Sequence, residues 1–449
     1  MAAAKDPYLA LRVANFRHYL LGGFLALLGR QAVTVAITWE VYQWTHSATA
    51  LGFVGLVNVL PLLTLSLPAG VLADRKNRKT ILVVGAVVYA ALNLALALLS
   101  AYRGHLPNAG PLPIAEDLIR RAALLFERHT DPASLHFNEP ALPLLFVLVL
   151  GLATCRILIW PSRSSITPLL VPPASLPNAI TWGATSFEIA TVAGPALGGF
   201  LIAYGGFPRV YLLAAALEIV YLWQLSQVHY PKIERALAKG KREWKDLWAG
   251  AAFIWRKKVI LGASSLDLFA VLLGGAVALL PIYADQILHV GPIGLGWLRA
   301  APSIGAIGMA FWTAHRTPFV RPGVVLLWAV GAFGVCIMVF GISRWFWLSF
   351  LALLFSGAFD NISVVIRNSL VQLLTPDDLR GRVTSVNQMF VGSSNEIGAL
   401  RAGLMAAVFG SVAAVVWGGI GTVVVVAVVT KTVPGLRRLA SLTTLKPED

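Results

Sequence analysis

A short cluster of charged residues between two long apolar runs is the feature that most constrains this chain. The segment Gly70-Val-Leu-Ala-Asp-Arg-Lys-Asn-Arg-Lys79 separates an apolar run at 51–73 from a second run at 81–101. Each run is long enough to cross the hydrocarbon layer as a helix, which takes about 20 residues. Lysine and arginine beside a span resist translocation, so this loop is predicted to lie on the cytoplasmic side. The chain is therefore predicted to be a multi-pass membrane protein.

Composition supports a membrane protein and argues against a nucleic-acid-binding protein. Of the 449 residues, 57% are hydrophobic and 13% are charged, whereas a soluble protein carries about 25% charged residues. The net charge of +15 is spread over the segments between apolar runs. It therefore predicts topology and attraction to anionic lipids, with no nucleic-acid partner. Cys155 and Cys336 both fall inside apolar runs, which predicts buried thiols and no metal site.

The apolar runs predict an all-α membrane protein with twelve transmembrane helices. The predicted spans are residues 16–43, 50–73, 80–101, 142–161, 180–204, 209–228, 258–284, 294–314, 322–341, 345–366, 384–408 and 411–431. An even number of spans returns the chain to its starting side. Together with the basic residues near the C-terminus, this predicts that both termini lie in the cytoplasm, with the protein in the inner (plasma) membrane.

A long basic segment divides the spans into two groups of six. Residues 229–257 are rich in lysine and arginine, and Trp244, Trp248 and Trp255 recur there at helical spacing. This pattern predicts an amphipathic linker helix on the inner membrane surface. The predicted domains are residues 1–228, the linker 229–257, and residues 258–449. Residues 102–142 are predicted to form an external insertion, which is either a solvated loop with a short helix at 114–129 or a lid or partner contact at the outer mouth.

The two groups of spans resemble each other in sequence. An offset of 204 positions places three pairs together: Arg163 with Arg367, Gly194 with Gly398, and Gly206 with Gly410. Nearer the N-terminus the offset is 244, which places Leu51-Gly52 on Leu295-Gly296. The difference between the offsets is about the length of the external insertion. The sequence thus predicts two six-helix repeats with substrate bound near the bilayer midplane between them.

The charged loop at 70–79 also resembles the loop 2–3 signature of the major facilitator superfamily. Asn77 stands where the family usually has glycine, and asparagine tolerates a left-handed backbone, so the turn is expected to survive. The resemblance implies that Gly70, Asp74, Arg75 and Arg78 form a gate. In that gate the Asp74 carboxylate would face a helix N-terminus of the opposite half and latch the outward-facing state.

Two further segments resemble parts of the same superfamily. The run Gly194-Pro195-Ala-Leu-Gly198-Gly199 is similar to the helix-five motif of its antiporters, although close helix packing through small residues explains it equally well. The stretch 376–382 resembles loop 10–11 of the enterobactin-exporter-like branch, with Asp377, Arg380 and Arg382 as its charged members. An ordinary cytoplasmic turn is the alternative.

The resemblance to this branch extends over nearly the whole chain except residues 102–142. It includes Trp39-Glu40-Val41-Tyr42 near the end of the first span and Leu170-Val171-Pro172 after the fourth. The branch contains macrolide-type drug exporters and siderophore exporters. The resemblance therefore implies efflux, without choosing between these two kinds of cargo.

Charges inside the predicted spans are the candidate substrate and proton sites, because a charge in hydrocarbon costs several kcal/mol unless it is paired or hydrated. In the superfamily, helices one, four, seven and ten line the cavity. That places Arg30, Asp267 and Asp360 first among the candidates. Glu188, Glu396 and Arg401 come next, Glu218 comes last, and Arg156 and Arg299 are further charges inside spans. The alternative is that these side chains form fixed arginine–carboxylate pairs.

These observations predict a secondary transporter that exports amphipathic, drug- or siderophore-like molecules in exchange for protons by alternating access. There is no Gly-x-x-x-x-Gly-Lys-Ser/Thr segment for ATP and no catalytic signature, so we expect neither an enzyme nor a cofactor. The expected partners are the cargo, protons and membrane lipids, and the expected state is a monomer. One alternative is a lysophospholipid translocator. Another is a non-transporting sensor or scaffold that binds through the external insertion.

Overall fold

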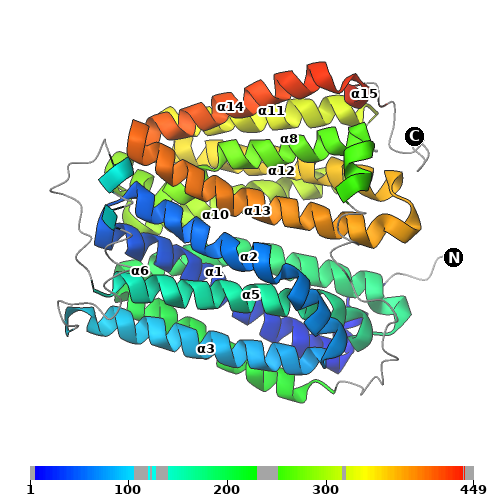
Figure 1. The fold of residues 1–449 in the computed structure, drawn as a ribbon. Coiled ribbons are helices and arrows are strands. Elements are labelled where there is room, and N and C mark those ends of the chain that lie inside the picture. The colour runs from blue at the N-terminus through cyan, green and yellow to red at the C-terminus, as the bar shows by residue number, and fades with distance from the viewer. Residues whose placement is uncertain are drawn as a thin grey trace. The chain divides into compact units, whose positions relative to one another are not determined.

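The computed structural model describes residues 6–105, 120–121, 124–127, 140–229, 251–315, 320–437 and 439. Most of the predicted linker at 229–257 and most of the external insertion lie outside these ranges. Of the linker, residues 251–256 are described and are helical. The regular structure within them is helical (Figure 1). Its long helices are α1 (Ala14–Thr45), α2 (Ala48–Arg75), α3 (Arg78–Tyr102), α5 (Leu142–Leu170), α6 (Leu176–Gln227), α8 (Lys258–Gly274), α10 (Gly291–Ala314), α11 (Pro322–Ile342), α12 (Phe346–Leu374), α13 (Asp377–Phe409) and α14 (Ser411–Thr432).

Every predicted span has a helical counterpart in the described residues. Nine helical stretches are long and apolar enough to cross a membrane. One of them, residues 173–227, contains two of the predicted spans. The spans predicted at 294–314 and 384–408 correspond to α10 and α13, whose polar residues lower their hydropathy. The prediction of an all-α membrane protein with twelve spans is therefore confirmed.

Two glycines at equivalent positions of the predicted repeat share one unusual conformation. Gly206 divides α6 with φ 71° and ψ 175°. Gly410 joins α13 to α14 with φ 85° and ψ 154°. Only glycine adopts this conformation without a steric penalty. The match extends the sequence repeat to the backbone, because each glycine makes a sharp turn between two successive spans.

The span predicted at 258–284 departs from a continuous helix. Helix α8 ends at Gly274, and Gly275 has ψ 69°, outside the helical range. The chain continues as a 3₁₀ turn at Ala276–Leu279, a short helical segment α9 (Leu280–Ile282) and a π-helical turn at Tyr283–Ile287. Two adjacent glycines weaken a helix at this point, since glycine loses the most backbone entropy on folding.

The chain divides into two compact units. The first comprises Met1–Glu40, Leu60–Glu116 and Asn138–Lys241, and the second comprises Val41–Val59, Asp117–Phe137 and Arg242–Asp449. In the first unit α3 packs against α5 and α6; in the second, α11 packs against α12 and α14, and α8 against α13 and α14 (Figure 1). These units do not decide the predicted domain boundaries at 228 and 258, which stay predictions.

Of the predicted helix at 114–129, residues 120, 121 and 124–126 are described and are helical.

The turn between α2 and α3 differs from the expected one. Asn77 has φ −64° and ψ 121°, so the expected left-handed conformation is wrong. Its side-chain oxygen instead accepts hydrogen bonds from the backbone N–H groups of Lys79, at 2.9 Å, and Thr80, at 3.4 Å. Asparagine is among the best residues for this N-cap role, so Asn77 stabilises the start of α3 through its side chain.

The Asn77 cap gives a test of this local structure. Replacing Asn77 with alanine should lower the free energy of unfolding by about 1 kcal/mol, because the first turn of α3 loses its acceptor. Replacing Asn77 with aspartate should leave the free energy of unfolding unchanged, because aspartate keeps the side-chain acceptor. Denaturant unfolding of the purified protein measures both, and an alanine variant as stable as the aspartate variant would contradict the cap.

Candidate functional site: buried charges in the helix bundles

Arg30 on α1 forms a bidentate ion pair with Glu218 on α6. The Arg30 Nε atom lies 2.6 Å from Glu218 Oε1, and Nη2 lies 3.0 Å from Oε2. The side chains are 14% and 2% exposed. Parallel guanidinium–carboxylate bonds of this kind are among the strongest polar contacts in proteins. Arg30 and Glu218 were ranked far apart as candidates, and the structure joins them.

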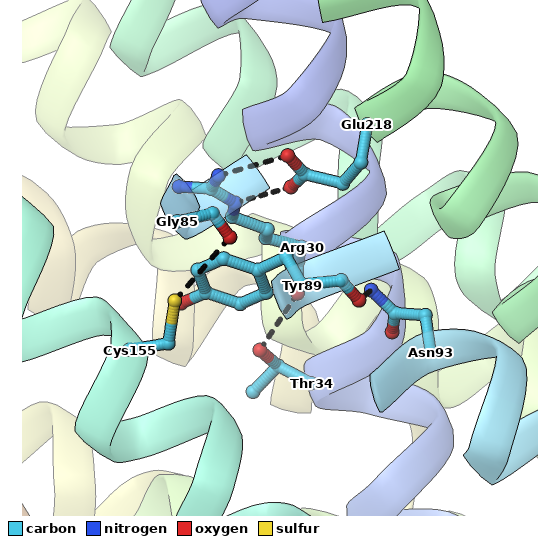
Figure 2. A network of polar contacts seen from close by, with 7 residues as sticks. All are labelled: Arg30, Thr34, Gly85, Tyr89, Asn93, Cys155 and Glu218. Atoms are coloured by element: carbon cyan, nitrogen blue, oxygen red, sulfur yellow. Dashed lines mark hydrogen bonds and ion pairs between the residues drawn. The ribbon is translucent and has the colours of Figure 1, made fainter. Parts of the chain in front are cut away.

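The same arginine also faces an aromatic ring. Its guanidinium carbon lies 3.9 Å from the centroid of the Tyr89 ring on α3, a favourable cation–π distance. Figure 2 shows Arg30 between Glu218 and Tyr89, with Asn93 donating to the Tyr89 carbonyl oxygen at 2.9 Å. The cluster thus links α1, α3 and α6 within the first unit, which matches the alternative of a fixed pair for Arg30. A role for Arg30 in transport stays a prediction.

A second buried pair lies in the other unit. Asp267 on α8 pairs with Arg367 on α12, and the two residues are 4% and 2% exposed. Sequence reasoning missed Arg367 as a buried charge within a helix, because the predicted span ended at residue 366 and α12 continues to Leu374. The repeat, which aligns Arg367 with Arg163, was the signal that pointed to it.

Arg401 lies where α8 is interrupted. Its Nη2 atom donates to the carbonyl oxygen of Leu273, in the last turn of α8, and its Nη1 atom lies 3.0 Å from the sulfur of Met405. A cation is favourable at a helix C-terminus, where carbonyl groups carry partial negative charge. Nearby in the same unit, the charges of Arg299 on α10 and Glu396 on α13 attract each other. Three of the ranked candidates, Asp267, Glu396 and Arg401, therefore have partners within the second unit.

Asp360 and Glu188 differ from the other candidates. Both are half-buried, Asp360 on α12 and Glu188 on α6. Among the described residues, neither carboxylate has a hydrogen-bond or ion-pair partner. A half-buried carboxylate without a partner is costly to keep charged, which distinguishes these two groups from the paired carboxylates. A role for either group in proton transport stays a prediction.

Glu40 is a buried carboxyl that was not predicted as a site residue. Glu40 near the end of α1 is 1% exposed, and it accepts hydrogen bonds from Ser100 Oγ at 2.5 Å and Tyr211 Oη at 2.6 Å. It entered the sequence analysis only through the resemblance of its motif. The available signal was an acidic residue inside an otherwise apolar run. Its two hydroxyl donors tie α1 to α3 and α6.

The gate residues lie at one end of the first unit. Gly70 is buried in α2, while Asp74 and Arg75 are exposed in its last turn. Arg78 Nη1 donates to the carbonyl oxygen of Ser165 on α5 at 2.6 Å. Beside it, Lys79 Nζ donates at 2.7 Å to the carbonyl oxygen of Val228, the residue that follows α6. These bonds hold the ends of α3, α5 and α6 together, and the predicted gate contact with the opposite half stays a prediction.

The helix-five motif brings α6 close to α1. All four motif residues, Gly194, Pro195, Gly198 and Gly199, are buried. A Cβ atom on Gly198 would lie 2.8 Å from the carbonyl oxygen of Ala32, so a larger residue does not fit. Close packing accounts for these small residues, and an antiporter role stays a prediction.

The charged segment after α12 is helical, where a loop was expected. Asp377, Arg380 and Arg382 belong to the first turns of α13, and Thr375 and Pro376 alone join α12 to α13. Proline lacks the N–H group that would continue α12, so the chain breaks there and starts a new helix at once.

Comparison with known proteins places the chain in a family. The sequence profile of the Major Facilitator Superfamily matches residues 19–399, and the chain belongs to this family of membrane transporters. It is 25% identical over 413 residues to an enterobactin exporter of Citrobacter koseri, covering 91% of this chain and 89% of the relative. An enterobactin exporter of Escherichia coli O1:K1 is 24% identical over the same shares.

Solved structures support the fold. A bacterial homologue of the human lysosomal transporter Spinster, inward-facing and unoccupied, superposes with a TM-score of 0.67 at 16% identity, over 97% of this chain and 99% of the other. A D-xylose–proton symporter gives 0.65 at 14% identity, over 94% and 98%. At these identities the likeness concerns the fold alone. The family match over residues 19–399 makes the chain a multi-pass secondary transporter of small molecules, in a family that is generally not enzymatic.

Proposed function

We propose that this transporter exports amphipathic, drug- or siderophore-like molecules in exchange for protons by alternating access. The observation that carries the proposal is the similarity to enterobactin exporters over 91% of the chain. The helix-five motif on α6 agrees with it, because the run resembles that of antiporters. The protein is proposed to act as a monomer in the inner membrane, with both termini in the cytoplasm, as the basic loop at 75–79 favours.

The buried charges suggest where a proton binds. Arg30 with Glu218 and Asp267 with Arg367 neutralise each other, so these pairs have little reason to exchange protons during transport. Asp360 and Glu188 have no such partner among the described residues. Asp360 lies in the tenth predicted span, which lines the central cavity in this family. We therefore propose Asp360 as the main proton-carrying group and Glu188 as the second.

A proteoliposome assay tests this proposal. The liposomes contain a pH-sensitive dye and carry an imposed proton gradient, and lipophilic cations, macrolides and catecholate siderophores are added in turn. We expect at least one cargo to drive proton movement in the wild type. In Asp360→Asn this movement should fall to the background of empty liposomes, because an amide cannot take up the proton. Asp6→Asn, outside the long helices, should behave like the wild type.

The other outcomes separate the alternatives. If Asp360→Asn still transports cargo with full proton movement, Asp360 is not part of the proton path. Absence of proton movement for every cargo, while labelled lysophospholipid still crosses, would overturn the antiporter and favour the lipid translocator. Absence of any transport by a folded protein would favour the sensor or scaffold.

A further inference from the structure

A small aromatic cavity lies within the first unit, between α1, α5 and α6. Its volume is about 190 Å³. Five aromatic side chains and one cation define its chemistry: Phe16, Tyr19, Phe24, Trp160, Phe187 and Arg163. None of these groups takes part in the buried ion pairs described above. The cavity is therefore a separate feature that requires its own explanation.

Arg163 is a cation without a carboxylate partner among the described residues. Its backbone carbonyl oxygen accepts a hydrogen bond from the Tyr19 hydroxyl at 3.0 Å, and its guanidinium interacts electrostatically with the hydroxyl groups of Tyr19 and Tyr221. Its counterpart in the second repeat, Arg367, pairs with Asp267. The same position thus carries a neutralised arginine in one half and an arginine without an anion in the other.

The position that carries the carboxylate partner in the second half is occupied by a glycine in the first half. The offset of 244 positions that aligns the early spans of the two halves places Asp267 on Gly23. Gly23 lines the cavity, and a Cβ atom built on it would have nothing within 4 Å. Where the second half has a carboxylate, the first half therefore has open space beside an arginine.

We propose that this cavity is a binding subsite for an aromatic ring that carries an anionic group. The anion takes the place beside Arg163 that Asp267 occupies beside Arg367, and the ring packs among the aromatic side chains. A guanidinium binds a carboxylate through two parallel bonds, and an apolar cavity of about 150 Å³ holds one benzene. The subsite thus admits one ring, as a free aromatic acid or as one arm of a larger cargo. A role of this subsite in recognising the cargo rests on the proposed export function.

Ligand-observed NMR on the full-length protein in lipid nanodiscs tests the subsite. Saturation-transfer titrations compare benzoate with neutral benzamide and with non-aromatic cyclohexanecarboxylate. We expect benzoate to bind at least about 10-fold more tightly than benzamide, as for a charged hydrogen bond. Cyclohexanecarboxylate should also bind more weakly than benzoate, because it cannot stack on the aromatic lining. A 4-carboxyphenyl group linked to polyethylene glycol that displaces benzoate indicates an arm of a larger cargo, and failure to displace it indicates a free acid.

Two variants make the test specific. Arg163→Gln should weaken the binding of benzoate at least about 10-fold and leave the binding of benzamide unchanged. Gly23→Asp should weaken the binding of benzoate by a similar factor although Arg163 is intact, because the new aspartate places a carboxylate of the protein beside Arg163. Arg209→Gln, at an exposed arginine of the same unit, is the matched control and should change nothing. Equal binding of benzoate and benzamide, or unchanged benzoate binding in folded Arg163→Gln, would overturn the proposal. These measurements need no proton gradient, so they stand apart from a failure of coupled export.

Discussion

Glu218→Gln should lower the free energy of unfolding by about 3–5 kcal/mol, the usual cost of removing one partner from a buried ion pair. Glutamine leaves the Arg30 guanidinium charged, 14% exposed and without its anion. The Tyr89 ring, 3.9 Å away, offsets only part of this cost, since a cation–π contact contributes about 0.5–2 kcal/mol. The double variant Arg30→Met/Glu218→Leu should recover most of the lost stability, because replacing a whole buried pair by apolar residues is often neutral.

Unfolding in mixed detergent micelles, followed by circular dichroism, measures these differences. The matched control is Arg12→Gln, which breaks the exposed pair between Arg12 and Asp6, with side chains 75% and 30% exposed. An exposed pair contributes about 0–1 kcal/mol, so this variant should unfold like the wild type. If Glu218→Gln lowers the free energy of unfolding no more than Arg12→Gln does, the buried ion pair between Arg30 and Glu218 is contradicted.

The double variant also separates the two explanations of Arg30. If the pair serves only to hold α1 against α6, Arg30→Met/Glu218→Leu should still transport cargo in proteoliposomes. Loss of transport from a stable double variant would restore Arg30 to the substrate or proton path, where the sequence analysis placed it.

The sequence predicted the spans well because the bilayer imposes a length and a composition on each of them. It predicted the sites less well, because a contact between two buried charges depends on how each helix is rotated and how deep each residue lies. Glu218 illustrates this: it was ranked last because the sixth helix stands behind the cavity in the family. That same position brings it against Arg30 within the first unit.

Short-range details escaped prediction for a different reason. Arg367 fell one residue beyond a predicted span, because apolar patterning locates a helix end only to within a few residues. At the interruption of α8 at Gly274 and Gly275, Arg401, which lies more than a hundred residues later in the chain, donates a hydrogen bond to the Leu273 carbonyl oxygen. Glycine is more frequent in membrane helices than in soluble ones, so these two glycines alone did not indicate a break.

The pair in the second unit should respond asymmetrically to mutation. Asp267→Asn leaves Arg367 buried with a charge that it cannot lose, because a guanidinium is not deprotonated in proteins. Arg367→Met leaves Asp267 buried, but a carboxyl group can become neutral by taking up a proton. We therefore expect Asp267→Asn to lose about 3–5 kcal/mol of unfolding free energy and Arg367→Met to lose less.

The asymmetry should also depend on pH. As the pH falls, a larger share of the Asp267 carboxyl in Arg367→Met is neutral, so this variant should recover stability relative to the wild type, in which the pair stays charged. Asp267→Asn should show no such recovery, because its buried arginine stays cationic at every pH of the titration. Melting temperatures of both variants between pH 8 and about pH 5, a range in which exposed aspartates stay ionised, test this directly. Parallel pH curves for the two variants would show that Asp267 and Arg367 do not neutralise each other in the folded protein, and Asp267 would return to the proton-carrying candidates beside Asp360.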